Sequence, residues 1–288
     1  MERGLIDLHI HSTASDGSFT PAEDVKMAVK LGLSAIALTD HDTVEGFKEA
    51  EEEAFRINSE AGREIIKVIP ALELSTATDR DIHILGYFVD TENEGFLNRL
   101  KEIRDQRDIR NEEMCERLRE EGVEIELSEL KKEFPGAIIT RAHFAELIIK
   151  KGYVSDRKAV FQKYIGDNCS CHVKLKSLTP GEGIDIIRSA GGIAVLAHPL
   201  LYRMKLPEID AFVGTLKEAG LCGIEAIYSN NRGYDEQNMR ALAKKYDLLI
   251  TGGSDFHGKN NKGVEMGRGK GNLKVPYEIL DELIAFRS

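Results

Sequence analysis

Seven short apolar runs, each four to eight residues long, recur along the chain. Most are rich in Ile, Val and Leu with little polar alternation, which is typical of strands covered on both faces. They are Leu5–Ile10, Ala35–Thr39, Lys67–Leu74, Ile82–Val89, Ile193–Ala197, Gly223–Tyr228 and Leu248–Thr251. Helical patterns lie between several runs, and two of them open with a Thr-Pro pair, at Thr20 and Thr179. This alternation predicts an α/β fold, a (β/α) barrel of parallel strands.

One region interrupts the rhythm between the fourth and fifth runs. It shows little strand signal and three helical patterns, at residues 94–121, 141–151 and 156–164. We therefore predict a barrel made of residues 1–90 and 178–288, with residues 91–177 inserted as a helical lobe that contributes to the substrate cleft. We interpret the charges on the lobe's long first helix, including those of Arg104, Arg107 and Arg110, as a solvated face, with lining of the cleft as the alternative.

Composition narrows the possible partners. The net charge of −10 disfavours binding to a long nucleic-acid duplex, which needs a broad basic surface, but it is compatible with a small phosphorylated substrate. Four cysteines are too few for a disulfide scaffold and indicate a reduced, cytoplasmic protein. No secretory signal is apparent at the start, and no apolar window is long enough to predict a membrane span. The sequence does not indicate an oligomeric state.

Histidines and acidic residues gather at the predicted strands. Six of the eight histidines lie within a predicted strand or just past its end. They are His9, His11, His41, His83, His198 and His257. On the first strand, a spacing of two is expected to place Asp7, His9 and His11 on the same side. Because the carboxyl ends of parallel barrel strands share one rim, we expect these side chains to converge there.

Imidazoles and carboxylates that converge in this way need a counter-charge, which divalent cations supply. The predicted metal ligands are His9, His11, Asp16, His41, Glu73, His83, His198, Asp255 and His257. Nine ligands are too many for one ion and suit two or three, and Glu73 is a candidate bridging carboxylate. Mn²⁺ is the expected ion, with Zn²⁺, Fe²⁺ and Mg²⁺ as alternatives that the same ligand types accept.

These motifs together resemble the PHP (polymerase and histidinol phosphatase) superfamily. The matching segments are Asp7–Ser12, Asp16-Gly17, Thr39–Asp42, Glu73, His83, Ala197–Pro199 and Gly253–His257. The resemblance implies a distorted (β/α)₇ barrel and a metal-dependent phosphoesterase. It also implies a division of the ligands, with His9, His11, Glu73 and Asp255 at one ion or the bridging position. Glu73, His83 and His198 would serve a second ion, and Asp16, His41 and His257 a third.

The middle of the chain resembles one branch of this superfamily. Residues 140–145, Thr-Arg-Ala-His-Phe-Ala, resemble the branch that removes the 3′-phosphate of nucleoside 3′,5′-bisphosphates, whose relatives trim short RNA from the 5′ end. The resemblance implies that Arg141 clamps the second phosphate, and His143 is a further candidate for the same pocket. Asp40 is predicted as a catalytic residue that, like Asp7, orients histidine ligands, and His198 is predicted to be catalytic as well as a ligand.

Several alternatives stay open at this point. A histidinol-phosphate phosphatase is the first, and an amidohydrolase-like hydrolase of a C–N bond is the second. The latter predicts a carbamylated lysine on a barrel strand, but Lys67 begins its strand and so lies at the wrong end. A non-catalytic module of a larger assembly is the third. The Cys169–His172 segment is interpreted as structural, with a metal site as the alternative, and Glu225 and Tyr228 are interpreted as packing or rim residues.

Overall fold

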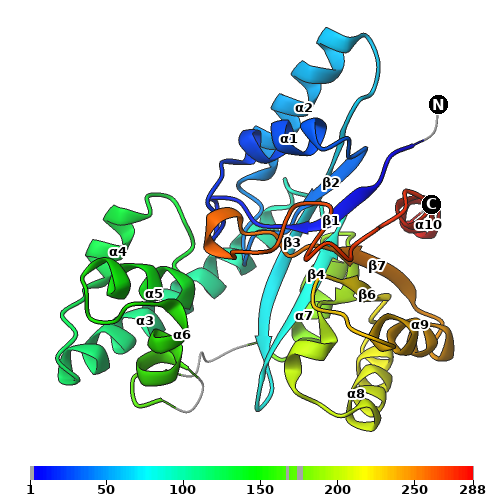
Figure 1. Ribbon diagram of the computed structural model, residues 1–288. Coiled ribbons are helices and arrows are strands. Elements are labelled where there is room, and N and C mark those ends of the chain that lie inside the picture. The colour runs from blue at the N-terminus through cyan, green and yellow to red at the C-terminus, as the bar shows by residue number, and fades with distance from the viewer. Residues whose placement is uncertain (1–2, 167–168, 174–177, 288) are drawn as a thin grey trace.

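A computed structural model describes residues 3–166, 169–173 and 178–287 of the chain (Figure 1). Seven strands form one sheet in the order of the sequence. They are β1 Ile6–Ile10, β2 Ala35–Leu38, β3 Lys67–Ala77, β4 Asp81–Tyr87, β5 Ile193–Leu196, β6 Gly223–Tyr228 and β7 Leu249–Gly253. The two edge strands meet at a parallel bridge between Ile10 and Phe256, so the sheet is a nearly closed barrel. The predicted seven-stranded α/β barrel is confirmed.

The prediction that all strands run parallel is wrong for β4. This strand pairs antiparallel with both β3 and β5, whereas the β1–β2, β2–β3, β5–β6 and β6–β7 pairs are parallel. The turn at residues 78–80 is too short for the crossover that a parallel neighbour would need, so β3 and β4 form a hairpin. As a result, the beginning of β4 and not its end lies at the rim, and this is how His83 reaches the other predicted ligands.

Helices surround the barrel, and a group of further helices projects from it (Figure 1). The helices around the barrel are α1 Pro21–Lys30, α2 Phe47–Ala61, α7 Pro180–Ser189, α8 Leu206–Glu218, α9 Asp235–Lys245 and α10 Glu278–Arg287, with the 3₁₀ turns η2 Pro199–Tyr202 and η3 Gly258–Asn260. Helices α1 and α7 begin at complete capping boxes, in which Thr20 and Thr179 cap the backbone and Glu23 and Glu182 reciprocate. Among the described residues, no helix is both long and apolar enough to cross a membrane.

The helices between β4 and α7 have a core of their own. They are α3 Glu94–Glu120, α4 Leu127–Glu133, α5 Arg141–Lys150, α6 Arg157–Val160 and a π-helical turn, η1 Phe161–Ile165. Apolar residues between Met114 and Val173 pack together here, whereas Phe96, Leu100 and Ile103 at the start of α3 pack with the barrel. The sequence did not indicate α4, and the third predicted helix is split between α6 and η1. The boundary at residue 177 lies outside the described residues, so the predicted division at 91–177 stays a prediction.

Barrel closure depends on Gly253 at the end of β7. A Cβ atom at this position would lie 2.3 Å from the Cβ of His9 and 2.5 Å from its backbone nitrogen, where neither atom has room to move. We predict that Gly253→Ala destabilises the fold by about 3 kcal/mol, which lowers the melting temperature by about 6–12 °C in a chain of this size. Thermal denaturation measures the change. Gly181→Ala is the control, because its Cβ would make an ordinary 3.8 Å contact with Ala219; equal melting temperatures for the two variants would contradict this account.

Candidate metal centre

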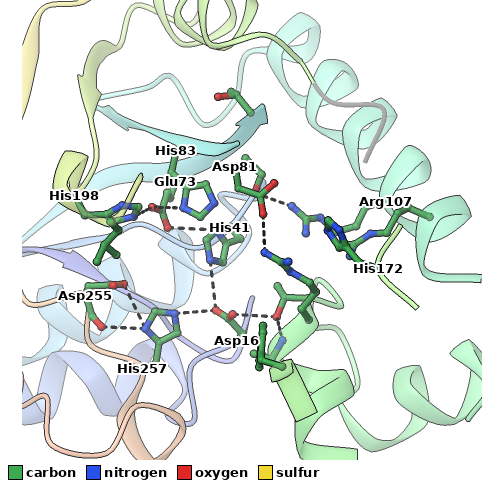
Figure 2. Close-up of a pocket in the computed structure, with 18 of the residues that line it drawn as sticks. Asp16, His41, Glu73, Asp81, His83, Arg107, His172, His198, Asp255 and His257 are labelled. Atoms are coloured by element: carbon green, nitrogen blue, oxygen red, sulfur yellow. Dashed lines mark hydrogen bonds and ion pairs between the residues drawn. The ribbon is translucent and has the colours of Figure 1, made fainter. Parts of the chain in front are cut away.

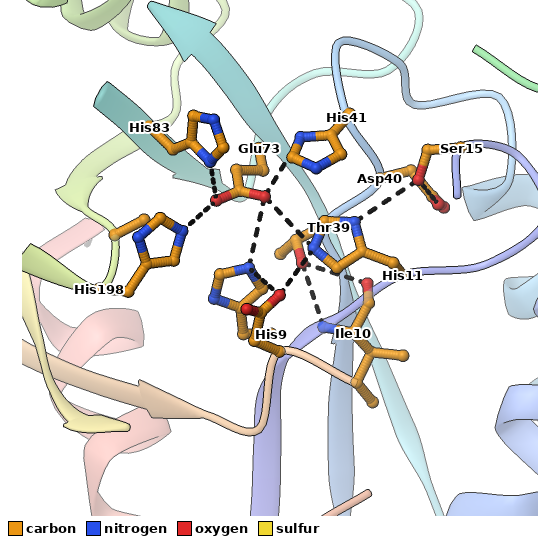
Figure 3. Close-up of polar contacts among 12 residues, drawn as sticks. His9, Ile10, His11, Ser15, Thr39, Asp40, His41, Glu73, His83 and His198 are labelled. Atoms are coloured by element: carbon orange, nitrogen blue, oxygen red, sulfur yellow. Dashed lines mark hydrogen bonds and ion pairs between the residues drawn. The ribbon is translucent and has the colours of Figure 1, made fainter. Parts of the chain in front are cut away.

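Five imidazoles surround the carboxylate of Glu73, which projects from β3 and is 1% exposed (Figure 3). Its oxygen Oε1 lies 2.9 Å from His83 Nδ1 and 2.8 Å from His198 Nε2. The second oxygen, Oε2, lies 3.2 Å from His11 Nε2, 3.3 Å from His41 Nδ1 and 3.5 Å from His9 Nε2. Each oxygen therefore faces a separate group of ring nitrogens, as a carboxylate that bridges two ions would.

A second group of predicted ligands lies beside the first. The Oδ1 atom of Asp255 is 3.5 Å from His9 Nε2, 3.4 Å from His11 Nε2 and 3.4 Å from His257 Nδ1. The Oδ1 atom of Asp16 is 3.2 Å from His257 Nε2. All nine residues predicted as ligands thus meet at one end of the barrel, although they come from six strand ends and one loop.

The surroundings of this cluster fit a set of cations. Buried ligand atoms that point into it have no hydrogen-bond partner: Nε2 of His9, Nε2 of His11, Nδ1 of His41 and Oδ1 of Asp16. Burying polar atoms without partners costs free energy, and a metal ion would remove that cost. Three groups have donor atoms within 4.8 Å of one another. These are His9, His11 and Glu73; His41, Glu73 and His83; and His11, Asp16, His41 and His257.

A β-bulge in β1 overturns the predicted position of Asp7. The four residues from Asp7 to Ile10 lie opposite only three residues of β2, Ile36 to Leu38, so the alternation shifts and the Asp7 carboxylate reaches the backbone of His9 but not the ring of His9 or His11. Its carboxylate accepts backbone N–H groups of Ser254, at 2.8 Å, and Gly267, at 2.6 Å. Asp7 therefore anchors the chain around β7 and contacts no imidazole side chain.

Asp40 also bonds to the chain around the cluster and not to a histidine ring. Its carboxylate accepts hydrogen bonds from the Ser12 hydroxyl, at 2.8 Å, and from the Ser15 hydroxyl, at 2.6 Å. The Ser15 oxygen lies 3.5 Å from His11 Nδ1. Asp40 thus acts on His11 through Ser15, which makes it a positioning residue and leaves its predicted catalytic role without a direct contact.

Two residues of β6 orient ligands, although the sequence suggested packing or rim roles for them. Glu225 Oε1 contacts His9 Nδ1 at 2.9 Å, and its Oε2 accepts the backbone N–H of His198 at 2.8 Å. The Tyr228 hydroxyl donates to Asp255 Oδ2 at 2.7 Å. Contacts of this kind fix the ring orientation and the tautomer of metal ligands. The only signal in the sequence was an acidic residue within an otherwise apolar strand.

The carboxylates change the proton affinity of the rings. Burial opposes protonation of His11, but the carboxylates of Asp255 and Glu73 outweigh it and raise its pKa to about 10. The pKa of His9 is likewise raised, because Glu225 and Glu73 outweigh burial. Burial dominates at His41 and lowers its pKa to about 3. Near neutral pH the His11 imidazole is therefore cationic, and a metal ion must displace one of its protons.

This proton competition gives a pH dependence. Since the pKa of His11 is raised from 6.5 to about 10, apparent metal affinity is expected to rise with pH across that interval, by up to tenfold per unit for each proton displaced. Calorimetric titration of the metal-free protein with Mn²⁺ at several pH values measures the effect, and buffers of different ionisation enthalpy count the protons released. An affinity that does not change between pH 6.5 and pH 8 would contradict it.

A cavity of about 280 Å³ opens beside the cluster, and four arginines line it. We call it the arginine cavity after Arg107, Arg110, Arg141 and Arg157. Figure 2 shows the cluster at one side and Arg107 with His172 at the other. Arg107 pairs with Asp42 and donates to Ser75 at 2.7 Å, and Arg141 donates to Asp81 at 2.6 Å.

Arg110 is the least compensated of these cations. It is 7% exposed, its Nε has no hydrogen-bond partner, and it forms no ion pair with any residue in the described ranges. Burial, together with the positive charges of Arg107 and Arg141, lowers its pKa to about 9. The interpretation of Arg107 and Arg110 as part of a solvated face is therefore wrong, whereas Arg104 does lie outside the cavity and contacts Glu45.

Of the other residues that the sequence suggested near the substrate, some line the cavity and others do not. Arg141 and, unexpectedly, His172 line the cavity. His143 does not: it is buried against Phe134, and its Nδ1 accepts the backbone N–H of Thr140 at 3.0 Å, so it caps α5. The thiols of Cys169 and Cys171 contact backbone carbonyls and join no group of metal-ligand geometry among the described residues.

Comparison with known proteins identifies the family. Residues 7–166, more than half of the chain, match the PHP domain. A 5′-3′ exoribonuclease of Haemophilus influenzae is 35% identical over 252 residues, covering 87% of this chain and 89% of its own. The chain belongs to the PHP family. It is a metal-dependent phosphoesterase, as the resemblance in sequence implied.

Other PHP relatives differ in what they act on. A 3′,5′-nucleoside bisphosphate phosphatase of Chromobacterium violaceum is 32% identical over 272 residues, covering 91% of this chain and 90% of its own. Two solved structures each superpose with a TM-score of 0.83. One, from Bifidobacterium adolescentis, is described as a metal-dependent phosphoesterase, is 27% identical and covers 99% and 96% of the two chains. The other, from Chromobacterium violaceum, is described as an amidohydrolase with bound sulfate, is 30% identical and covers 98% and 96%.

Proposed function

We propose that this PHP enzyme removes the 3′-phosphate from nucleoside 3′,5′-bisphosphates and also trims short 5′-phosphorylated oligonucleotides. Two or three divalent cations would be held by the nine residues around Glu73 and Asp16, with Mn²⁺ as the expected ion. The cytoplasm stays the predicted location.

One observation carries this proposal: the arginine cavity and the metal centre share their walls. His41, Glu73, His83, His198, Asp255 and His257 line the same cavity as the four arginines. The positive charges of Arg107, Arg110 and Arg141 repel each other, and the buried Arg110 guanidinium, which has no ion-pair partner among the described residues, is costly unless an anion enters. A substrate with two phosphates satisfies both ends, one at the cations and one at the arginines.

The bound cations and the chain's own side chains would have different roles in the reaction. Bound cations would neutralise the phosphoryl oxygens and lower the pKa of a water molecule. Arg110 and Arg141 would hold the second phosphate, and the planar guanidinium can bind two of its oxygens at once. Glu225 and Tyr228 keep His9 and Asp255 in their orientations. The hydroxyl of Thr140 donates to Asp16 Oδ2 at 3.0 Å, which couples the start of α5 to the metal centre.

The direct test is phosphate release from adenosine 3′,5′-bisphosphate by the Mn²⁺-loaded enzyme, beside adenosine 3′-monophosphate and histidinol phosphate. The proposal expects the bisphosphate to have the highest kcat/KM, because it alone fills both sites. Arg141→Ala should mainly raise KM for the bisphosphate. Equal turnover of the three substrates, or preference for histidinol phosphate, would contradict the proposal.

Hydrolysis of a C–N bond is the second candidate, since one structural neighbour is described as an amidohydrolase. No lysine occurs among the described residues that line the arginine cavity, so the cavity wall offers no lysine for carbamylation. The arginines also favour an anionic substrate over an amide. Both observations support the phosphoesterase assignment.

A further inference from the structure

A second, larger hollow adjoins the metal centre. It encloses about 960 Å³, and four of the side chains that line it are cationic: Arg157, Lys158, Lys259 and Lys262. We call it the lysine groove. Glu146 and Asp156 are its acidic residues apart from Asp255, and the carboxylate of Asp156 already accepts the backbone N–H of Ala159 at 2.9 Å to cap α6. Four cationic and three acidic side chains line the groove, and Asp255 is a proposed metal ligand, so the part beyond the metal centre carries an excess of positive charge in a chain whose net charge is −10.

The lysine groove and the arginine cavity meet at the metal centre. Asp255 and His257 line both of them. Arg157 also lies between the two, where its Nη1 donates to the carbonyl of Asn260 at 2.5 Å. Asn260 in turn donates to the backbone carbonyl of Asp16 at 3.0 Å. A substrate bound at the cations can therefore extend in two directions, into the arginine cavity and into the lysine groove.

The proposed reaction explains why a substrate would extend into the lysine groove as well as into the arginine cavity. A water oxygen bonds to phosphorus and the P–O3′ bond breaks; one water proton ends on O3′, and the other stays with the phosphate that carries the water oxygen. With a nucleoside 3′,5′-bisphosphate, the products are a nucleoside 5′-phosphate and inorganic phosphate. If the same phosphorus also carries the O5′ of a following nucleoside, the same bond breaks and the phosphate stays on the shortened chain. The first nucleotide then occupies the arginine cavity, and the following ones must leave the metal centre elsewhere.

We propose that the lysine groove binds the nucleotides that follow the scissile phosphate in a short single-stranded, 5′-phosphorylated oligonucleotide. This inference rests on the proposed function of the metal centre. Lys158, Lys259 and Lys262 are exposed and form no ion pair with any residue that the structure describes, and Lys259 Nζ lies 5.8 Å from the centre of the Phe19 ring. Their ammonium groups are therefore available to backbone phosphates. The described residues that line the groove include no Phe, Tyr or Trp, and its one aromatic ring, that of His257, belongs to the metal centre, so the rest of the groove offers no platform for base stacking. Recognition beyond the scissile phosphate should therefore be independent of base sequence.

The test measures two substrates with a double variant of the groove and with a double variant elsewhere as the control. Lys259→Ala/Lys262→Ala should raise KM for a 5′-phosphorylated pentaribonucleotide about tenfold, while KM for adenosine 3′,5′-bisphosphate changes less than twofold. Loss of two phosphate contacts should also reduce the slope of log KM against log salt by about 1.4. Anisotropy of a labelled pentaribonucleotide on the metal-free protein gives a second readout and should show the same loss of affinity. Lys48→Ala/Lys244→Ala, on exposed residues of α2 and α9, is the control of equal charge.

The outcomes separate the two proposals. A groove variant that behaves like the control on the oligonucleotide overturns the inference, as does equal loss on both substrates. Wild-type enzyme that hydrolyses the bisphosphate but not the oligonucleotide overturns the inference and leaves the proposed function standing. Wild-type enzyme that hydrolyses neither substrate overturns the proposed function, and this inference with it.

Discussion

Glu73→Gln is expected to lower kcat by at least about 10³-fold and to remove at least one bound cation. The carboxylate is the one group that faces all five imidazoles, and its two oxygens serve different sets of ring nitrogens. The amide has nearly the same shape, but it carries no charge, and its nitrogen has no free lone pair to donate to a cation. Elemental analysis of the purified variant and its kcat measure the two effects.

Glu225→Gln provides the graded comparison for this variant. Glu225 contacts His9 Nδ1 and the backbone of His198 and would not touch a cation, so we expect a loss of about 10–100-fold in metal affinity or activity. The account is contradicted if Glu73→Gln keeps its full metal content and activity. It is also contradicted if the Glu225 variant is the more damaged of the two.

Arg110→Ala is expected to lower kcat/KM for adenosine 3′,5′-bisphosphate by about 100-fold, since it removes a charged hydrogen-bond donor from a buried phosphate site. Its effect on adenosine 3′-monophosphate should be small, because that substrate leaves the arginine cavity without a phosphate. The variant should remain folded: in the free enzyme, burial and the neighbouring arginines already work against the charge of Arg110. Steady-state kinetics on both substrates, with a melting curve, test these expectations.

Arg104→Ala is the matched control for Arg110→Ala. Both residues lie on α3, but Arg104 contacts Glu45 and does not line the cavity. The control should keep kcat/KM for both substrates near the wild-type values. If Arg110→Ala instead lowers kcat/KM equally for the bisphosphate and the monophosphate, the cavity does not bind the second phosphate.

Much of the fold and the meeting of the nine side chains could be predicted because both follow from local patterns. A run of Ile, Val and Leu predicts a buried strand, and a histidine at its end predicts a position at the rim. What escaped prediction depends on pairing between strands. The bulge that turns the Asp7 carboxylate away from the His9 ring and the antiparallel course of β4 are set by register and turn length, which no single segment encodes.

Side-chain roles within the lobe were harder to predict for another reason. Arg107 and Arg110 occur in a helix rich in charges of both signs, and only the packing of α3 against the barrel shows which face is buried. The backbone of Asp255, with φ of 57°, and that of His198, with φ of 26°, adopt conformations that sequence patterns do not indicate. Tertiary contacts hold both residues in place at the cluster.

Anomalous diffraction from crystals grown with Mn²⁺ is the most direct test of whether these side chains form one metal centre. Two or three peaks are expected about 2.0–2.3 Å from the oxygens of Glu73, Asp16 or Asp255 and the facing histidine nitrogens. Crystals without anomalous peaks in this cluster, or with ions bound only elsewhere, would contradict the account.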